Sequence, residues 1–327
     1  MTEPVILVII LALAFDFLNG IHDSSNVVAT MISSRAFSPR VALGITAVAE
    51  FCGPFLFGVA VAKTIGHEIV SADTISITVL VAALVSAILW NLLTWYLGFP
   101  SSSSHALIGG LIGAVVMAAG WQAIQIPGLM KILFTLFTSP LIGFVIGFLI
   151  LRLVYLLCWN ASPRINSVFK RGQMITGVTL ALSHGANDAQ KSMGIITLAL
   201  VIAGNLKEFV VPMWVIVICA AMIAFGTSIG GWRLIRTMGG KFFKIRPVDG
   251  FASQLASASV ILSASLMGGP VSTTQVVSSS IMGVGAAERV NKVRWGVAQE
   301  IAVAWVLTIP ASALVGAGVY LLVSQFM

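Results

Sequence analysis

The chain has 327 residues, of which 58% are hydrophobic and only 9% are charged, and its mean hydropathy is +1.03. This composition excludes a soluble domain and indicates an all-α protein that crosses the lipid bilayer many times. The formal net charge of +7 requires no nucleic-acid partner, because most basic residues follow a membrane topology. The cysteines Cys52, Cys158 and Cys219 lie in apolar runs, which is typical of core packing rather than of a disulfide or metal site.

Apolar runs predict about ten membrane spans, several of them short or interrupted by Gly and Pro. Their approximate bounds are 4–32, 41–62, 75–97, 104–121, 131–152, 172–203, 210–232, 251–268, 271–286 and 296–325. The first run leads into a polar motif rather than a small-residue cleavage site. We therefore interpret it as a span and not as a removable signal peptide.

Basic residues are distributed unevenly between the two sets of loops. Fourteen of the 18 lie in alternating loops, three lie in the opposite loops, and Lys191 lies inside a span. By the positive-inside rule the richer loops face the cytoplasm, so both termini of this plasma-membrane protein are expected outside. Five spans per half then give two repeats of opposite orientation, 1–152 and 172–327, joined by a cytoplasmic linker at 153–171.

Two similar polar motifs interrupt the apolar spans, one in each half. Asn-Gly-Ile-His-Asp-Ser-Ser-Asn at 19–26 aligns with His-Gly-Ala-Asn-Asp-Ala-Gln-Lys at 184–191. Ionisable groups inside a span are costly and indicate a substrate or ion site. Carboxylates beside carboxamides suit Na⁺ or a proton. We therefore predict a cation-coupling site at Asn19, Asp23, Asn26, Asn187, Asp188 and Gln190, with Asp23 and Asp188 as the Na⁺ ligands.

Simpler interpretations of these motifs remain open. Asp188 and Lys191, spaced i,i+3, could form a buried pair that only pins helices together. His22 and His184 could orient the site or take up a proton, but a role as hydrogen-bonded packing residues is equally compatible with the pattern.

A second repeated element comes later in each half. Gly-Phe-Pro-Ser-Ser-Ser-Ser-His at 98–105 aligns with Gly-Gly-Pro-Val-Ser-Thr-Thr-Gln at 268–275. Each reads as a helix start with a hydroxyl cluster, where free N–H groups and the helix dipole favour an anion. An ordinary capped helix start is the alternative, but two matched copies favour an anion site. Its predicted residues are Ser101, Ser102, Ser103, Ser104, His105, Ser272, Thr273, Thr274 and Gln275, together with Lys191.

A cation and an anion held together lower each other's desolvation cost, which is the physical basis of symport. We therefore expect a transporter that works by alternating access. A passive anion channel would share the anion site but would not need the paired Asp motifs. An intramembrane hydrolase is disfavoured, because Gly-x-Ser-x-Gly is absent around the candidate serines and two inverted copies serve no single catalytic site. We do not expect an enzyme.

The chain resembles the inorganic phosphate transporter family, in particular its short bacterial members, essentially from end to end. The resemblance is carried by the two Asp motifs, the two hydroxyl clusters, and the segments at 90–96, 230–233 and 304–310. It implies symport of phosphate with Na⁺ or H⁺ and no other cofactor. It also places Glu50 near the cation site. The oligomeric state is left open, with a homodimer as one option.

Three positions depart from the family pattern. Gln275 stands where His is usual, Gln254 stands where an acidic residue is common, and Glu50 stands where short members often carry Asn. The resemblance places Gln254 near the anion site. Protonated phosphate can donate to a carboxylate and sulfate cannot, so the two glutamines favour sulfate, while the intact aspartates favour phosphate. Phosphate is the expected substrate, and a sulfate permease of the same fold is the alternative.

Overall fold

The structure is a computed structural model that describes residues 3–70, 75–99, 101–240 and 243–327. Within those ranges the regular secondary structure is helical, apart from an isolated bridge between Val70 and Ile124. The first six α-helices are α1 (Glu3–Ser33), α2 (Pro39–Phe57), α3 (Ala60–Lys63), α4 (Ile77–Leu97), α5 (Ser103–Ala119) and α6 (Ile126–Leu157). The next six are α7 (Ile165–Ile202), α8 (Met213–Ile229), α9 (Trp232–Gly240), α10 (Pro247–Leu266), α11 (Thr273–Glu288) and α12 (Trp295–Val323).

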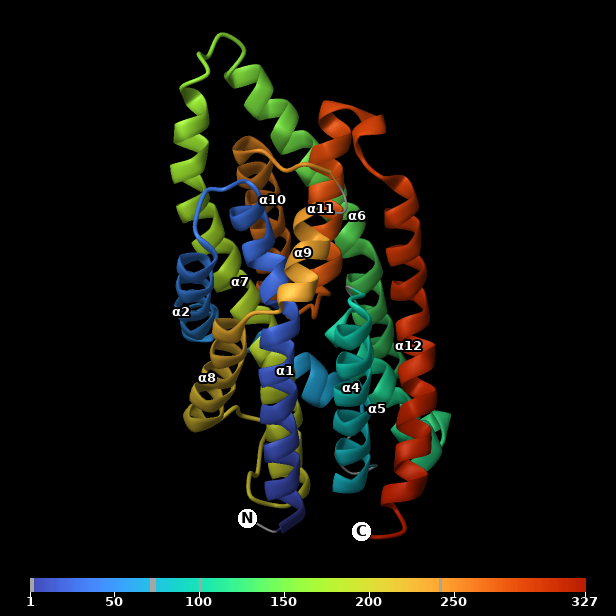
Figure 1. The fold of residues 1–327 in the computed structure, drawn as a ribbon. Helices are drawn as coiled ribbons and strands as arrows, with labels where there is room; N and C mark the ends of the chain where they lie inside the picture. Colours follow the sequence, from blue (N-terminus) through green and yellow to red (C-terminus); the bar gives the residue numbers. More distant parts are fainter. Residues whose placement is uncertain (1–2, 71–74, 100, 241–242) are drawn as a thin grey trace.

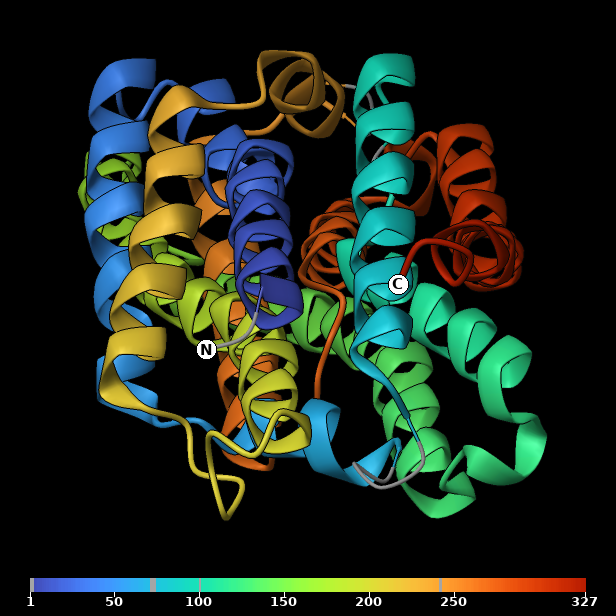
Figure 2. The same ribbon diagram turned by 90° about the horizontal axis from the view of Figure 1, so that it is seen from below.

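Helices from the first half of the chain pack against helices from the second half. Helix α1 packs on α8 while α2 packs on α7, and α5 packs on α12 while α6 packs on α11. Seen from below, α1 lies between α8 and α4 (Figure 2). The order of helix lengths also recurs, with 31, 19, 4, 21, 17 and 32 residues in α1–α6 and 38, 17, 9, 20, 16 and 29 in α7–α12.

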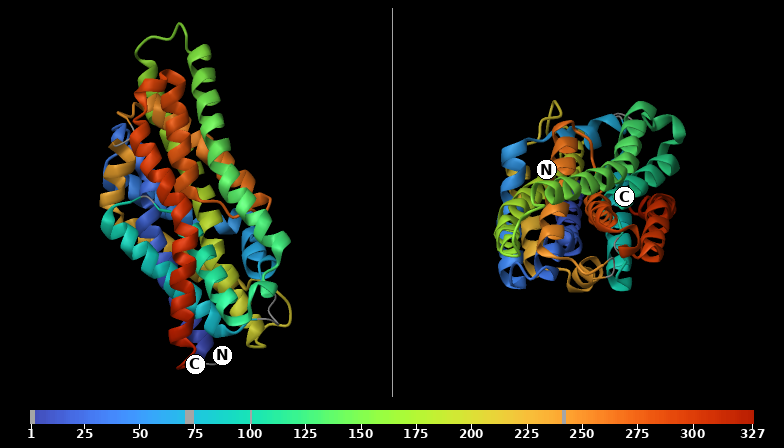
Figure 3. Two further views of the ribbon diagram at one scale, coloured as in Figure 1. Left: turned by 90° about the vertical axis from the view of Figure 1, so that its right-hand side faces the viewer. Right: turned by 90° about the horizontal axis from the view of Figure 1, so that it is seen from above.

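In the part of the chain that the structure describes, five helices are long and apolar enough to cross a membrane, namely α1, α2, α4, α6 and α12. Helices α5 and α8 are apolar but shorter. Helices α7, α10 and α11 carry many of the polar side chains, which lowers their hydropathy. The protein is therefore a multi-pass membrane protein. Both termini lie at one end of the bundle, and the connection between α6 and α7 lies at the other (Figures 1 and 3).

Two predicted spans are divided in the structure. The span expected at 41–62 breaks where α2 ends, because Gly58 has φ +77° and the chain then resumes as α3 and a π-helical turn at Thr64–Glu68. The span expected at 210–232 ends earlier, because Gly230 has φ +79° and separates α8 from α9. The segment expected as a linker, 153–171, is mostly helical: α6 runs to Leu157 and α7 begins at Ile165.

The apolar core consists of two clusters with a polar layer between them. On α1, Val5 and Phe15 belong to the first cluster, and Val27 and Met31 belong to the second. On α7 the order is reversed, since Leu180 belongs to the second cluster and the later part of the helix belongs to the first. The two helices therefore run in opposite directions, and the polar stretch of each crosses the same layer.

Candidate functional site

Helices α5 and α11 begin at the two hydroxyl clusters. Ser102 caps α5 by accepting the backbone N–H of His105 at 3.1 Å, and Ser272 caps α11 by accepting that of Gln275 at 3.4 Å. Both helices thus begin where the sequence predicted helix starts. Pro100, part of the first predicted break, lies outside the described residues.

These two helix starts face each other at the centre of the protein. The Ser104 hydroxyl donates to the carbonyl of Val271, just before α11, at 2.9 Å. The amide nitrogen of Gln275 lies 3.4 Å from Nε2 of His105. Corresponding positions of the two motifs therefore meet side chain to side chain, and the starts of the two helices lie together. Because Gln275 carries a neutral carboxamide, His105 does not face a second imidazole at this position.

Asp23, on α1, faces the starts of both helices. Its carboxylate oxygens lie 3.3 Å from the hydroxyls of Ser103 and Thr273 and 3.1 Å from that of Thr274. Nδ1 of the neighbouring His22 lies 2.8 Å from the same carboxylate. One carboxylate therefore joins α1 to hydroxyls from both halves of the chain.

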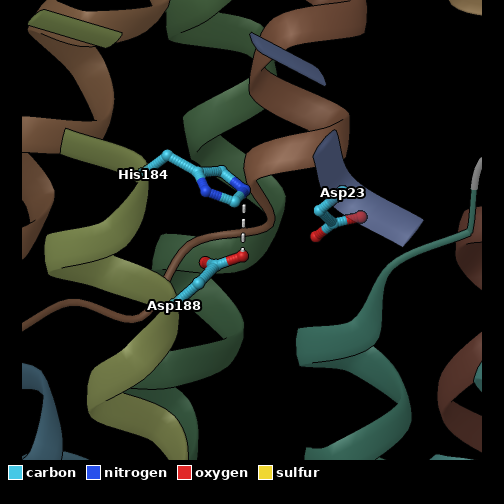
Figure 4. Close-up of side chains that lie close together, drawn as sticks. All are labelled: Asp23, His184 and Asp188. Carbon is cyan, nitrogen blue, oxygen red and sulfur yellow. Dashed lines mark ion pairs between the residues drawn. The ribbon is translucent and has the colours of Figure 1, made fainter. Parts of the chain in front are cut away.

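Asp188, on α7, lies across from Asp23 (Figure 4). Its oxygens lie 3.2 Å from the Thr273 hydroxyl, 3.2 Å from the Asn19 amide nitrogen and 2.5 Å from the Lys191 ammonium. Thr273 therefore bridges the two aspartates. The ion pair between Asp188 and Lys191 that the sequence allowed is formed, and it lies within the cluster.

His184 connects this cluster to a third carboxylate. Its Nε2 lies 3.3 Å from Asp188, as the dashed line in Figure 4 marks, and its Nδ1 lies 2.9 Å from Glu50 on α2. The Thr227 hydroxyl on α8 donates to the other oxygen of Glu50 at 2.5 Å. A continuous row of polar groups thus runs through α1, α7, α2 and α8.

The cluster is enclosed, because the side chains of Asp23, Asp188 and Glu50 are at most 1% exposed. Three carboxylates face one ammonium, so with neutral histidines the group has an excess of negative charge. Buried charge of one sign is stable only with a compensating partner. The cluster therefore suits bound cations or protons, and it could accept an anion only together with them.

Several oxygen and nitrogen atoms lie close enough together that they could hold a cation. One ligand atom from each of Asp23, His184 and Asp188 lies within 4.8 Å of the others. The side-chain oxygens of Asn19 and Asn26 are buried and have no hydrogen-bond partner, while the Asn26 amide donates to Thr274 at 3.0 Å. Carboxylate and carboxamide oxygens are the donors that hard cations prefer.

The remaining predicted residues lie beside the cluster rather than in it. Asn187 orders the segment before α11 through Ser265 at 2.9 Å and the Val271 N–H at 3.3 Å. Gln190 accepts the N–H of Val61 at 2.8 Å and thereby caps the start of α3. Both side chains hold the broken helices in place.

Ser101 and Gln254 lie further from the two aspartates. Ser101 accepts the Trp90 indole N–H at 2.9 Å. Gln254 accepts the Thr176 hydroxyl at 2.7 Å and donates to Thr30 at 2.8 Å, which joins α10 to α7 and α1. Among the described hydrogen bonds, Gln254 has no contact with the hydroxyl clusters.

Two further residues of the polar layer, Asp16 and Thr227, were not predicted from the sequence. Asp16 is a fully buried carboxylate within α1, and the general cost of intramembrane charge would have flagged it. Thr227 has no such signal, because its role depends on how α8 packs against α1 and α2.

A model of the phosphate transporter family matches residues 19–316 of the chain. The chain belongs to the phosphate transporter family. A "Probable low-affinity inorganic phosphate transporter" of Bacillus subtilis (strain 168) is 47% identical over 98% of this chain and 97% of its own length. A protein of the same name from Rhizobium meliloti (strain 1021) is 45% identical over 95% and 94% of the two chains.

A solved structure called "The sodium-dependent phosphate transporter" has the same fold. It superposes with a TM-score of 0.93 over 100% of both chains, at 24% identity. This transporter family is not a family of enzymes. Its relatives are named for phosphate, so the comparisons give no support to the sulfate alternative.

Proposed function

We propose that this phosphate transporter is a secondary active symporter that carries phosphate together with Na⁺ by alternating access. The observation that carries the proposal is the bridge from Thr273 to both Asp23 and Asp188 at 3.3 and 3.2 Å. Groups suited to an anion and groups suited to a cation are thereby in direct contact. Their binding is coupled, because each ion offsets the charge of the other.

The anion would bind where α5 and α11 begin. The first N–H groups of a helix have no intrahelical acceptor, and those of Ser103, Ser104, Thr273 and Thr274 occupy these positions. Together with the hydroxyls and two helix dipoles they suit a tetrahedral oxyanion. A protonated phosphate can also donate to Asp23 or Asp188, which sulfate cannot do.

The cation would bind between Asp23 and Asp188, with the free oxygens of Asn19 and Asn26 as further donors. The structural neighbour is called a sodium-dependent phosphate transporter, which agrees with Na⁺ as the cation. Lys191 and the bound Na⁺ would supply the positive charge that a phosphate needs in this otherwise anionic cluster.

Two inverted repeats, residues 1–152 and 172–327 with the linker on the cytoplasmic side and both termini outside, would provide the alternating access. The recurring helix lengths support this arrangement, and so does the packing of helices from one half on helices from the other. So do matching close contacts: Gly20 lies against the backbone of α8 at Ile223, and Gly185 lies against that of α2 at Glu50. Rocking one half against the other would open the enclosed site to each side in turn.

Uptake into proteoliposomes tests the proposal. Labelled phosphate should accumulate under an inward Na⁺ gradient, excess sulfate should not compete, and Asp23→Asn and Asp188→Asn should each abolish accumulation. Glu68→Gln is the control, because Glu68 pairs with Lys131 outside the cluster. Phosphate flux that ignores every cation gradient would identify a passive channel instead. Normal gradient-driven uptake by either aspartate variant would overturn the site assignment.

A further inference from the structure

A fourth carboxylate lies within the membrane-spanning part of α1, two turns before Asp23. Asp16 is fully buried, and seven residues of helix place it about 10 Å from Asp23 along the axis. Oδ1 of Asp16 accepts the Ser192 hydroxyl of α7 at 2.5 Å, whereas Oδ2 has no hydrogen-bond partner. The contacts of the cluster around Asp23 and Asp188 do not include this carboxyl.

The surroundings of Asp16 are poor in compensating groups. The Ser192 hydroxyl also reaches the carbonyl of Ala12 at 3.3 Å, and the Cys219 thiol of α8 lies beside the carboxyl. The charged groups that act on it are Lys191 and Asp188 on α7, and these two already pair with each other at 2.5 Å. Asp16 therefore has no cation of its own among the described residues.

A carboxyl in such a place holds a proton more readily than a metal ion. Burying an unpaired carboxylate is so costly that the group takes up a proton instead. A hard cation would need several oxygen ligands, and here the described neighbours supply only the Ser192 hydroxyl and the Ala12 carbonyl. A proton needs only the free lone pair of Oδ2.

We propose that Asp16 is a proton-binding site, separate from the Na⁺ site, that takes up a proton from one side of the membrane and releases it on the other during each phosphate transport cycle. The inference rests on the proposed symport. A hydronium ion from the solvent donates the proton to Oδ2 when the site is open to one side, which gives a neutral carboxyl and water. The O–H bond breaks when the site opens to the other side, and water accepts the proton.

The hydrogen bond from Ser192 links this proton to the movement of the two halves. It joins α1 to α7, and Ser192 directly follows Lys191 in the sequence. A hydroxyl binds a carboxylate more strongly than a neutral carboxyl. Protonation of Asp16 therefore weakens a contact between helices of different halves, and deprotonation strengthens it.

Proton movement with phosphate tests the site directly. Vesicles that contain a pH-sensitive dye should report about one proton fewer per phosphate for Asp16→Asn than for the wild type. Comparison at equal phosphate flux cancels the titration of phosphate itself. Asp16→Glu should restore the missing proton, because it keeps a titratable group. Ser192→Ala should keep the proton but shift the pH dependence of uptake.

A second readout does not depend on transport. Infrared difference spectra between acid and alkaline pH should contain the carbonyl band of a buried protonated carboxyl, and Asp16→Asn should lose that band. An unchanged band together with an unchanged ratio of protons to phosphate would overturn the inference. That result would not affect the symport proposal, because Na⁺-driven phosphate uptake by the wild type tests symport separately. Failure of that uptake would instead refute the proposed function, on which this inference rests.

Discussion

The ammonium of Lys191 lies 2.5 Å from Oδ1 of Asp188, and both side chains are fully buried. The two residues are one helical turn apart on α7, so the pair alone would be compatible with a purely structural role. However, Asp188 also contacts Thr273 and Asn19. The lysine thus compensates a carboxylate that faces the start of α11, and its charge is available to a bound anion.

Replacement of Lys191 separates its structural and functional roles. Lys191→Gln leaves Asp188 buried without its ammonium partner, which should destabilise the protein by about 3–5 kcal/mol. Lys191→Gln combined with Asp188→Asn should recover most of that stability, because no unpaired charge remains. Thermal unfolding in detergent measures both effects.

The double variant should nevertheless not transport phosphate, because it lacks a cation ligand and the positive charge. Phosphate binding measured by calorimetry in the presence of Na⁺ completes the test. Unchanged phosphate affinity in Lys191→Gln would return Lys191 to a structural role.

The hydroxyl of Thr273 should contribute strongly to the binding of phosphate or Na⁺. Thr273→Val keeps the shape of the side chain but removes the bridge between the two aspartates. Hydrogen bonds to charged groups contribute about 1.5–3 kcal/mol, so phosphate or Na⁺ affinity should fall by at least about tenfold.

Thr197→Val is the matched control for Thr273→Val, because Thr197 is a fully buried threonine on α7 whose hydroxyl has no hydrogen-bond partner. It should leave affinity and stability close to wild type. Equal losses of affinity in the two variants would show that the effect is one of packing and not of the bridge.

Much of this site follows from the sequence, because it is built from duplicated motifs. Asp23 and Asp188 align in the two halves, and the structure brings both to Thr273. The helix starts at Ser102 and Ser272 follow from the local chemistry of capping. Local patterns were sufficient in these cases.

Other residues could not be placed without the tertiary structure. Gln190 resembles a site residue in its motif, yet it caps α3, because the close crossing of α2 and α7 brings that break to it. Gln254 was placed by family resemblance, whereas its partners Thr176 and Thr30 depend on where three helices cross. The division of α2 from α3 depended on the conformation of Gly58, which hydropathy does not reveal.

The crossing of α2 over α7 should tolerate no added methyl group. A Cβ at Gly53 would lie 2.3 Å from the carbonyl of Leu182 and 2.7 Å from the N–H of Ala186. These atoms belong to the helix backbone, so Gly53→Ala must push α2 away from α7. Overpacking of this kind costs about 1–3 kcal/mol.

The displacement should also separate Glu50 from His184 and reduce uptake. Gly44→Ala is the control on the same helix, because a Cβ there has nothing within 4 Å. It should unfold at or slightly above the wild-type temperature, since alanine favours helix over glycine. Thermal unfolding and phosphate uptake of the two variants decide the question. Equal behaviour would mean that the crossing can relax.

The buried Asp249 should be far more sensitive to substitution than the exposed Glu68. At the start of α10, Asp249 is 1% exposed and lies 3.2 Å from Arg246 and 3.3 Å from Lys292. Burial alone would lower the pKa of Arg246, but the hydrogen bond and the charge of Asp249 raise this pKa above its ordinary value. Asp249→Asn would also replace the charged oxygen that completes the capping box of α10 with a neutral amide oxygen. We expect a loss of about 1–3 kcal/mol.

Glu68 provides the comparison, because its pair with Lys131 at 2.8 Å is 38% and 43% exposed. Water and salt screen such a pair, so Glu68→Gln should cost less than about 1 kcal/mol. Unfolding temperatures at low and high salt measure both variants. Only the Asp249→Asn loss should persist at high salt, because screening has little effect on a weakened helix cap or on a buried polar contact. If high salt abolishes the loss of stability in both variants, Asp249 behaves as an ordinary surface charge.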